Sequence, residues 1–102
     1  MKSTSVKEMT LKEVQDFFMS RHGKGDRDVS KHMFMTILME EVGELATELL
    51  EGNSNQGIGA ELADILFVVF CLANKLDIDI MDEMEEKYFL ELKEKTNETN
   101  AT

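Results

Sequence analysis

Two groups of carboxylate side chains stand at helical spacing within apolar segments. The first group is Glu40, Glu41 and Glu44 in the segment MEEVGEL, and the second is Glu61 and Asp64 in ELADILF. Acids three or four residues apart lie on one face of a helix, where their like charges repel. An unpaired carboxylate in apolar surroundings is also costly. A hard divalent cation such as Mg²⁺, which prefers oxygen ligands, would neutralise both groups.

The two groups can form one site. Glu41 and Glu44 project about 60° apart at ~100° per residue, as do Glu61 and Asp64 on their own helix. A short connection between the two helices favours antiparallel packing, which lets the pairs face each other. Four carboxylates would then surround Mg²⁺, with Mn²⁺ as a substitute, and leave positions for water and substrate phosphates.

The net charge and the positions of the basic residues restrict the possible functions further. The formal net charge of −10 argues against a nucleic-acid-binding protein, which usually carries a basic face. Nevertheless, both arginines, Arg21 and Arg27, fall in one short stretch with Lys24 and Lys31. Cations beside carboxylate-held Mg²⁺ favour phosphoryl transfer. A di-iron centre would need histidines three residues after the glutamates, and neither histidine stands there.

Composition predicts one all-α domain. The chain has 102 residues, no proline, no tryptophan and six glycines. We expect a single domain over residues 1–102, with a core from about 10 to 90 and a frayed tail from about 96 to 102. The lone Cys71 and the lack of an apolar leader segment predict a cytoplasmic protein.

Capping residues, turns and apolar stripes predict four helices in an up-and-down arrangement. The first begins with a capping-box pattern, Thr10 to Glu13. The polar segment NSNQGIG predicts a turn between the second and third. The expected helices run from Thr10 to about His22, from Asp28 or Ser30 to Gly52, from about Ile58 to Lys75, and from Asp77 or Asp79 through MDEMEEKYFLELKEK.

The third helix predicts association between chains. Its run Ile65–Ala73 is nine residues long, whereas a membrane span needs roughly 20. The run is apolar on every face, which exceeds what a small monomer can bury. Small domains also gain stability by oligomerising. We therefore expect a homodimer or homotetramer that does not enter a membrane.

The carboxylate motifs carry a resemblance to a known family. The segment Glu40–Ala46, followed after a turn by Glu61–Leu66, resembles the paired EExxE and ExxD motifs of MazG-type nucleotide pyrophosphohydrolases, of the all-α nucleoside triphosphate pyrophosphatase superfamily. The similarity continues to Lys87 and covers roughly residues 10 to 90. It implies Mg²⁺-dependent cleavage of a ribo- or deoxynucleoside triphosphate to the monophosphate and pyrophosphate. The sequence leaves open whether the role is housecleaning of aberrant nucleotides or control of nucleotide pools.

The resemblance also implies roles for individual residues. The metal ligands would be Glu41, Glu44, Glu61 and Asp64. Glu40 would orient the attacking water or reach an additional metal, and Glu40 and Glu41 are the expected catalytic residues. Side chains near the substrate would include Arg27, Asp28 and Lys87, while Lys31 is added because of its charge.

Two departures and several alternatives stand beside this interpretation. Phe89-Leu90-Glu91-Leu92 replaces the asparagine and basic residues of many members, and the N-terminal region lacks a tryptophan that could stack on a base. Phe18 or His22 could take that stacking role. The alternatives are a phosphoribosyl-ATP pyrophosphohydrolase, a dUTPase- or dCTPase-type member of the superfamily, or a non-catalytic helical oligomerisation module. The sequence leaves the preferred base open.

Overall fold

A computed structural model describes residues 5–22 and 29–94 of the chain. Within these residues the regular structure is helical, without strands, which confirms the all-α prediction. The elements are η1 (Val6–Glu8), α1 (Leu11–His22), α2 (Lys31–Leu50), α3 (Asn55–Lys75) and α4 (Ile80–Tyr88). Arg27, Asp28 and the predicted frayed tail lie outside the described residues.

Side chains cap the helices largely where the sequence predicts. At the start of α1, the Thr10 N–H donates to Glu13 Oε1 at 2.8 Å and the Glu13 N–H donates to Thr10 Oγ1 at 3.1 Å, which confirms the capping box. Ser30 caps α2, and Asp79 caps α4. Asp77 instead adopts the left-handed conformation after α3, with φ of 57°.

Two helix boundaries differ from the prediction. The third helix begins at Asn55, ahead of the expected Ile58, because Ser54 caps it and accepts a hydrogen bond from the Gly57 N–H. The fourth helix ends at Tyr88, and helical backbone resumes at residues 90–94. The break occurs at Phe89, whose φ and ψ of −124° and 21° leave the α-helical region.

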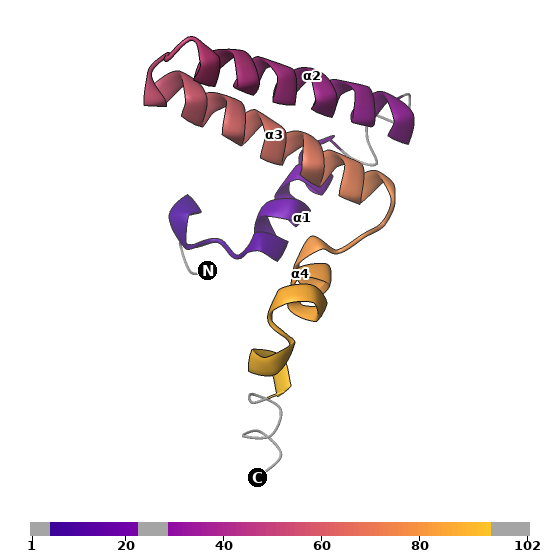
Figure 1. The fold of residues 1–102 in the computed structure, drawn as a ribbon. Helices are drawn as coiled ribbons and strands as arrows, with labels where there is room; N and C mark the ends of the chain where they lie inside the picture. Colours follow the sequence, from indigo (N-terminus) through magenta and orange to yellow (C-terminus); the bar gives the residue numbers. More distant parts are fainter. Residues whose placement is uncertain (1–4, 23–28, 95–102) are drawn as a thin grey trace.

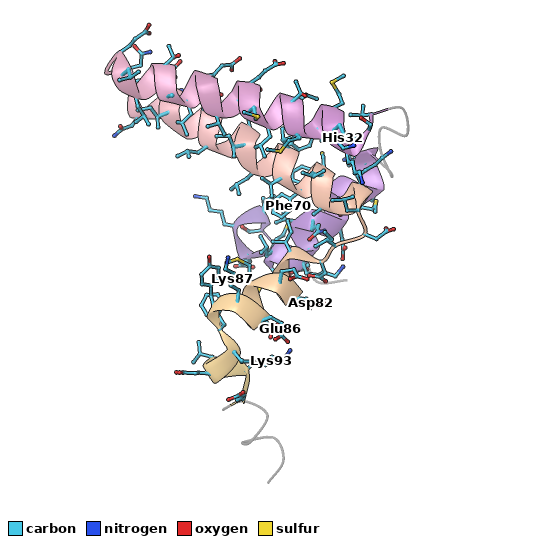
Figure 2. All side chains as sticks on the ribbon, turned by 45° about the vertical axis from the view of Figure 1, so that its right-hand side comes forward. His32, Phe70, Asp82, Glu86, Lys87 and Lys93 are labelled. Carbon is cyan, nitrogen blue, oxygen red and sulfur yellow. The ribbon has the colours of Figure 1, made fainter. Side chains whose placement is uncertain are left out.

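The longest helices form an antiparallel hairpin (Figure 1). In it, α2 and α3 lie side by side, α1 packs across α3, and α4 leaves the end of α3 to contact α1. Phe34, Val68 and Cys71 form the buried core cluster. The Phe18 ring joins α1 to this core, with its centroid 4.9 Å from that of Phe67 and 5.7 Å from that of Phe70, which Figure 2 labels.

The single chain has an open shape. Its radius of gyration is 16.8 Å, whereas a compact domain of this length measures about 13 Å. Large apolar side chains on α2 and α3 are correspondingly exposed. On α2, Met39 is 64% exposed and Leu49 58%, and on α3 Leu66 is 57% exposed. The hairpin therefore presents an apolar surface that one chain does not cover.

Among the described helices, α3 is long and apolar enough to cross a membrane by length and composition. Of the most apolar 18-residue window of α3, 22% is buried inside the chain. The core helices of soluble proteins meet the same criteria. A membrane-spanning α3 would also place Glu61 and Asp64 in hydrocarbon, where each charge costs about 3 kcal/mol on insertion scales.

Candidate metal centre

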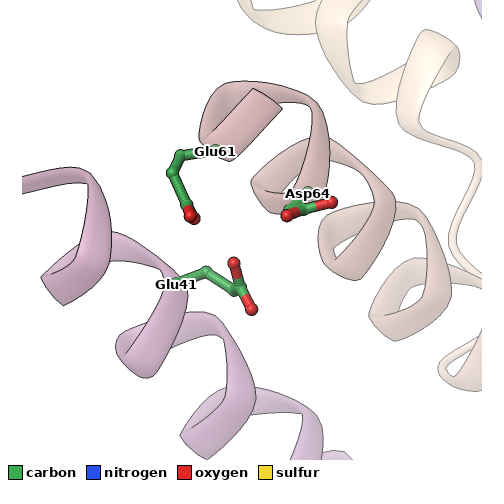
Figure 3. A group of neighbouring side chains, drawn as sticks. All are labelled: Glu41, Glu61 and Asp64. Carbon is green, nitrogen blue, oxygen red and sulfur yellow. The ribbon is translucent and has the colours of Figure 1, made fainter. Parts of the chain in front are cut away.

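The hairpin brings three carboxylates of the two motifs together. Glu41 on α2 and Glu61 and Asp64 on α3 each offer one carboxylate oxygen, and the three oxygens lie within 4.8 Å of one another. Figure 3 shows Glu41 pointing across the hairpin towards the two acids of α3. The antiparallel packing expected from the short connection thus makes the two motifs neighbours in space.

Two oxygens of this cluster are buried without a partner. The Oε2 atoms of Glu41 and Glu61 have almost no solvent exposure, and neither has a hydrogen-bond partner among the described residues. Asp64 is exposed and opens the cluster to solvent. Buried carboxylate oxygens normally accept hydrogen bonds, so this pair points to a proton or a cation that neutralises it.

Electrostatics at the cluster favour protonation of Glu61. Loss of solvation and a hydrogen bond that its protonated carboxyl can give to Glu41 raise the pKa of Glu61 to about 7. The negative charges of Glu44, Glu41 and Asp64 add to this increase. Because two ionised carboxylates are both acceptors, Glu41 and Glu61 can share a hydrogen bond only while one of them carries a proton.

The remaining predicted site residues that the structure describes lie outside this group of three acids. Glu44 acts on Glu61 through its charge but does not supply an oxygen to the group of three. Glu40 is exposed on α2. Lys31 is the first residue of α2, about 15 Å along the helix axis from Glu41 at 1.5 Å per residue. Lys87 lies on α4, with its Nζ 5.4 Å from the Tyr88 ring centroid.

Sequence reasoning missed Glu48, which continues the carboxylate face of α2 towards the turn. Its spacing of four and seven residues from Glu44 and Glu41 was the available signal. Glu48 Oε2 lies 3.0 Å from the position that a Cβ atom on Gly57 would occupy. This places the carboxylate at the first turn of α3, where the helix dipole favours a negative charge. Glu48 does not belong to the group of three clustered acids.

The donor set fits a hard divalent cation. All three clustered ligand atoms are carboxylate oxygens, which suit Mg²⁺ or Mn²⁺ better than zinc or copper. Such an ion would give the Oε2 atoms of Glu41 and Glu61 the partner that they lack among the described residues. The exposed Asp64 leaves one side of the cluster open to water or substrate.

Comparison with known proteins identifies one family. The sequence model of the MazG nucleotide pyrophosphohydrolase domain matches residues 29–97, which include α2, α3, α4 and all the clustered acids. Neither a curated protein nor a solved structure matches the chain.

Proposed function

The chain belongs to the MazG nucleotide pyrophosphohydrolase domain family, and from this premise we propose that it is an active, divalent-metal-dependent enzyme. Its reaction cleaves a ribo- or deoxynucleoside triphosphate to the monophosphate and pyrophosphate, and it serves nucleotide-pool housecleaning. The observation that carries the proposal is the pair of buried, unpartnered oxygens of Glu41 and Glu61 beside the exposed Asp64.

Four carboxylates would hold the metal: Glu41, Glu44, Glu61 and Asp64. When bound, Mg²⁺ supplies charge neutralisation for the phosphates and lowers the pKa of water. Glu61 must release its proton before it can act as a ligand, because its pKa is raised to about 7. The cluster therefore exchanges a proton for a metal ion near neutral pH.

The other residues handle water and phosphate. A water oxygen forms a bond to the α-phosphorus as the bond to the α–β bridging oxygen breaks, and pyrophosphate leaves. Glu40, exposed beside Glu41 on α2, orients this water and accepts its proton. Positive charges of Arg27, Lys31 and Lys87 offset the charge on the phosphate oxygens, and Asp28 contacts the substrate.

A homo-oligomer fits this proposal. Met35, Met39, Val42 and Leu49 on α2 are all about half exposed or more, and successive members are four, three and seven residues apart. Such a stripe is typical of helices that pack against a partner helix. Both a dimer and a tetramer would cover the stripe.

The alternative functions are enzymes of the same superfamily with other substrates and a protein without catalytic activity. A phosphoribosyl-ATP pyrophosphohydrolase or a dUTPase- or dCTPase-type enzyme would use the same carboxylates on a narrower set of nucleotides. A non-catalytic oligomerisation module would keep the apolar stripe and turn over nothing. In each enzymatic case nucleic acids are not partners, in keeping with the net charge of −10. Membranes are not partners either, in keeping with the charged Glu61 and Asp64 within α3.

The deciding experiment measures pyrophosphate release. Ribo- and deoxynucleoside triphosphates, including dUTP and dCTP, and phosphoribosyl-ATP are each incubated with Mg²⁺ or with a chelator. Glu41→Gln is compared with Glu48→Gln, a matched change on the same helix face. Metal-dependent release by the wild type and Glu48→Gln, but not by Glu41→Gln, supports the proposal. A folded wild type that releases nothing with any substrate favours the oligomerisation module.

A further inference from the structure

A buried pair of amide side chains ties α1 to the end of α3. Gln15 on α1 is 4% exposed and Asn74 on α3 is 7% exposed. Gln15 Nε2 donates to Asn74 Oδ1 at 2.9 Å, and Asn74 Nδ2 donates to the main-chain oxygen of Gln15 at 3.2 Å. Two amides in the core of so small a chain are costly unless every group is paired.

Gln15 also binds the backbone where α4 begins. Its Nε2 donates to the Ile78 main-chain oxygen at 2.6 Å, and its Oε1 accepts from the Ile80 N–H at 3.1 Å. These two backbone groups flank Asp79, the residue that caps α4. The Gln15 amide therefore uses both its donors and its acceptor, and it holds α4 at its first residue.

Neighbouring groups restrict the same junction. Asp77 turns the chain after α3 in the left-handed conformation, and the Ile78 N–H closes that turn on the Ala73 main-chain oxygen at 2.9 Å. Lys12, one turn before Gln15, lies with its Nζ 3.7 Å from Asp79 Oδ2. The chain therefore enters α4 in one geometry, and α1 supplies the side chains that fix it.

The direction of α4 decides where its cation lies. α4 packs on α1, and Lys87 near its end is the only basic residue in the helix. Figure 2 shows Lys87 on the side of α4 near α1. Lys87 lies seven residues after Ile80, or about 10 Å along the helix axis at 1.5 Å per residue. A change in the angle of the helix at Ile80 therefore displaces Lys87. The same change in the direction of the first turn displaces Lys87 more than it displaces the residues next to Ile80.

We propose that Gln15 is a positioning residue for the triphosphate: by gripping Ile78 and Ile80, it fixes the orientation of α4 and hence the place of Lys87. This inference rests on the proposed function, because it assigns Lys87 to the phosphate chain of the substrate. Gln15 itself does not touch the substrate. Its effect should therefore appear in substrate binding and only through Lys87.

A double-mutant cycle tests this inference. Gln15→Met keeps the length of the side chain and removes its hydrogen bonds, while Gln56→Met is the control at an exposed position of α3. Gln15→Met should raise KM for the triphosphate roughly three- to tenfold, the effect of about one hydrogen bond, and leave kcat nearly unchanged. In a Lys87→Ala background the same change should leave KM where Lys87→Ala alone sets it. Amide exchange at Ile80 should accelerate in Gln15→Met and stay unchanged in Gln56→Met.

Other results would overturn the inference. An unchanged KM in Gln15→Met, or an equal increase with and without Lys87, would show that the amide pair has a structural role alone. If Gln15→Met does not fold, Gln15→Asn gives the same comparison, because it keeps a neutral amide on a side chain one methylene shorter, which weakens the contacts with Ile78 and Ile80. A wild type without turnover would remove the proposed function and this inference together, an outcome distinct from turnover that is insensitive to Gln15.

Discussion

Glu41 and Glu61 face each other across the α2–α3 hairpin with one buried oxygen each, and neither oxygen finds a hydrogen-bond donor within residues 5–22 and 29–94. Two acceptors in this position repel until a proton or a cation lies between them. The hairpin thus stores an unfavourable interaction that a bound proton or cation would relieve. This arrangement is common at functional sites, where stability is given up for binding.

Replacement of Glu41 should separate stability from activity. Glu41→Gln removes one negative charge and adds a donor that can bond to Glu61, so the metal-free variant should unfold at a higher urea concentration than the wild type. Its pyrophosphate release should fall by about two orders of magnitude or more, because a metal ligand is lost. Urea denaturation with chelator and a turnover assay with Mg²⁺ measure the two effects. A variant that is less stable and fully active would contradict the metal assignment.

The stability of the metal-free protein should depend on pH through Glu61. Its pKa is raised from 4.5 to about 7, so between these values the folded state binds more protons than the unfolded state. The contribution of Glu61 to stability is therefore present at low pH and is lost as pH rises towards 7 and beyond. Urea denaturation with chelator from pH 5 to 8 should show this decline, and Glu61→Gln should flatten it. An equal slope in both proteins would rule out Glu61 as its source.

Metal binding should release protons near neutral pH. Because Glu61 must ionise to act as a ligand, Mg²⁺ affinity should increase as pH rises through about 7. Calorimetric titrations of Mg²⁺ in buffers of different ionisation enthalpy would count the protons. We expect a fraction of one proton at pH 7 for the wild type and Glu48→Gln, and a smaller fraction as pH rises above 7. A count that does not change with pH would assign the proton to another group.

The cap of α3 should contribute to the stability of the hairpin. Ser54 accepts the hydrogen bond of the Gly57 N–H at 3.3 Å at the start of the helix that carries Glu61 and Asp64. Ser54→Ala should lower the free energy of unfolding by about 1 kcal/mol, the usual loss for a missing N-cap. Ser20→Ala is the control, because Ser20 lies within α1, where its Oγ donates to the Phe17 main-chain oxygen. Equal losses in the two variants would show that the cap has no special effect.

The apolar stripe of α2 should mediate association. Met39, which is 64% exposed, lies in the middle of this stripe, and Met39→Lys would place a charge at the proposed interface. The molar mass from light scattering should fall towards that of one chain, 11.6 kDa, in this variant. Val6→Lys, at a 79% exposed position of η1, should leave the mass unchanged. A wild type that is already monomeric would contradict the oligomer.

Sequence patterns predicted the parts of this fold that local chemistry determines. The Thr10–Glu13 capping box and the helix-spaced acids are local signals, and the structure contains the box and the hairpin that makes Glu41 and Glu61 neighbours. The MazG resemblance is confirmed by the match over residues 29–97. The segment NSNQGIG predicts a turn, whereas in the structure Ser54 caps a helix that includes Gly57.

The Gln15–Asn74 pair, the surroundings of Glu48 and the position of α4 depend on contacts between distant segments, so local sequence patterns do not predict them. Gln15 and Asn74 are 59 positions apart, and a single glutamine in an amphipathic helix normally faces solvent. The environment of Glu48 is equally non-local, since it depends on the register that sets Gly57 opposite it. The position of α4 also follows from the Gln15 contacts with the backbone, which sequence periodicity does not specify.

The uncovered face of the hairpin has a thermodynamic consequence. In a chain that joins its partner through α2 and α3, folding and association are one equilibrium, and mass action governs both. Dilution would then favour the unfolded chain, and any nucleotide that bridges two subunits would favour the assembled one. The radius of gyration of 16.8 Å would then describe one subunit of such an assembly, whose population would depend on how much of the protein a cell makes.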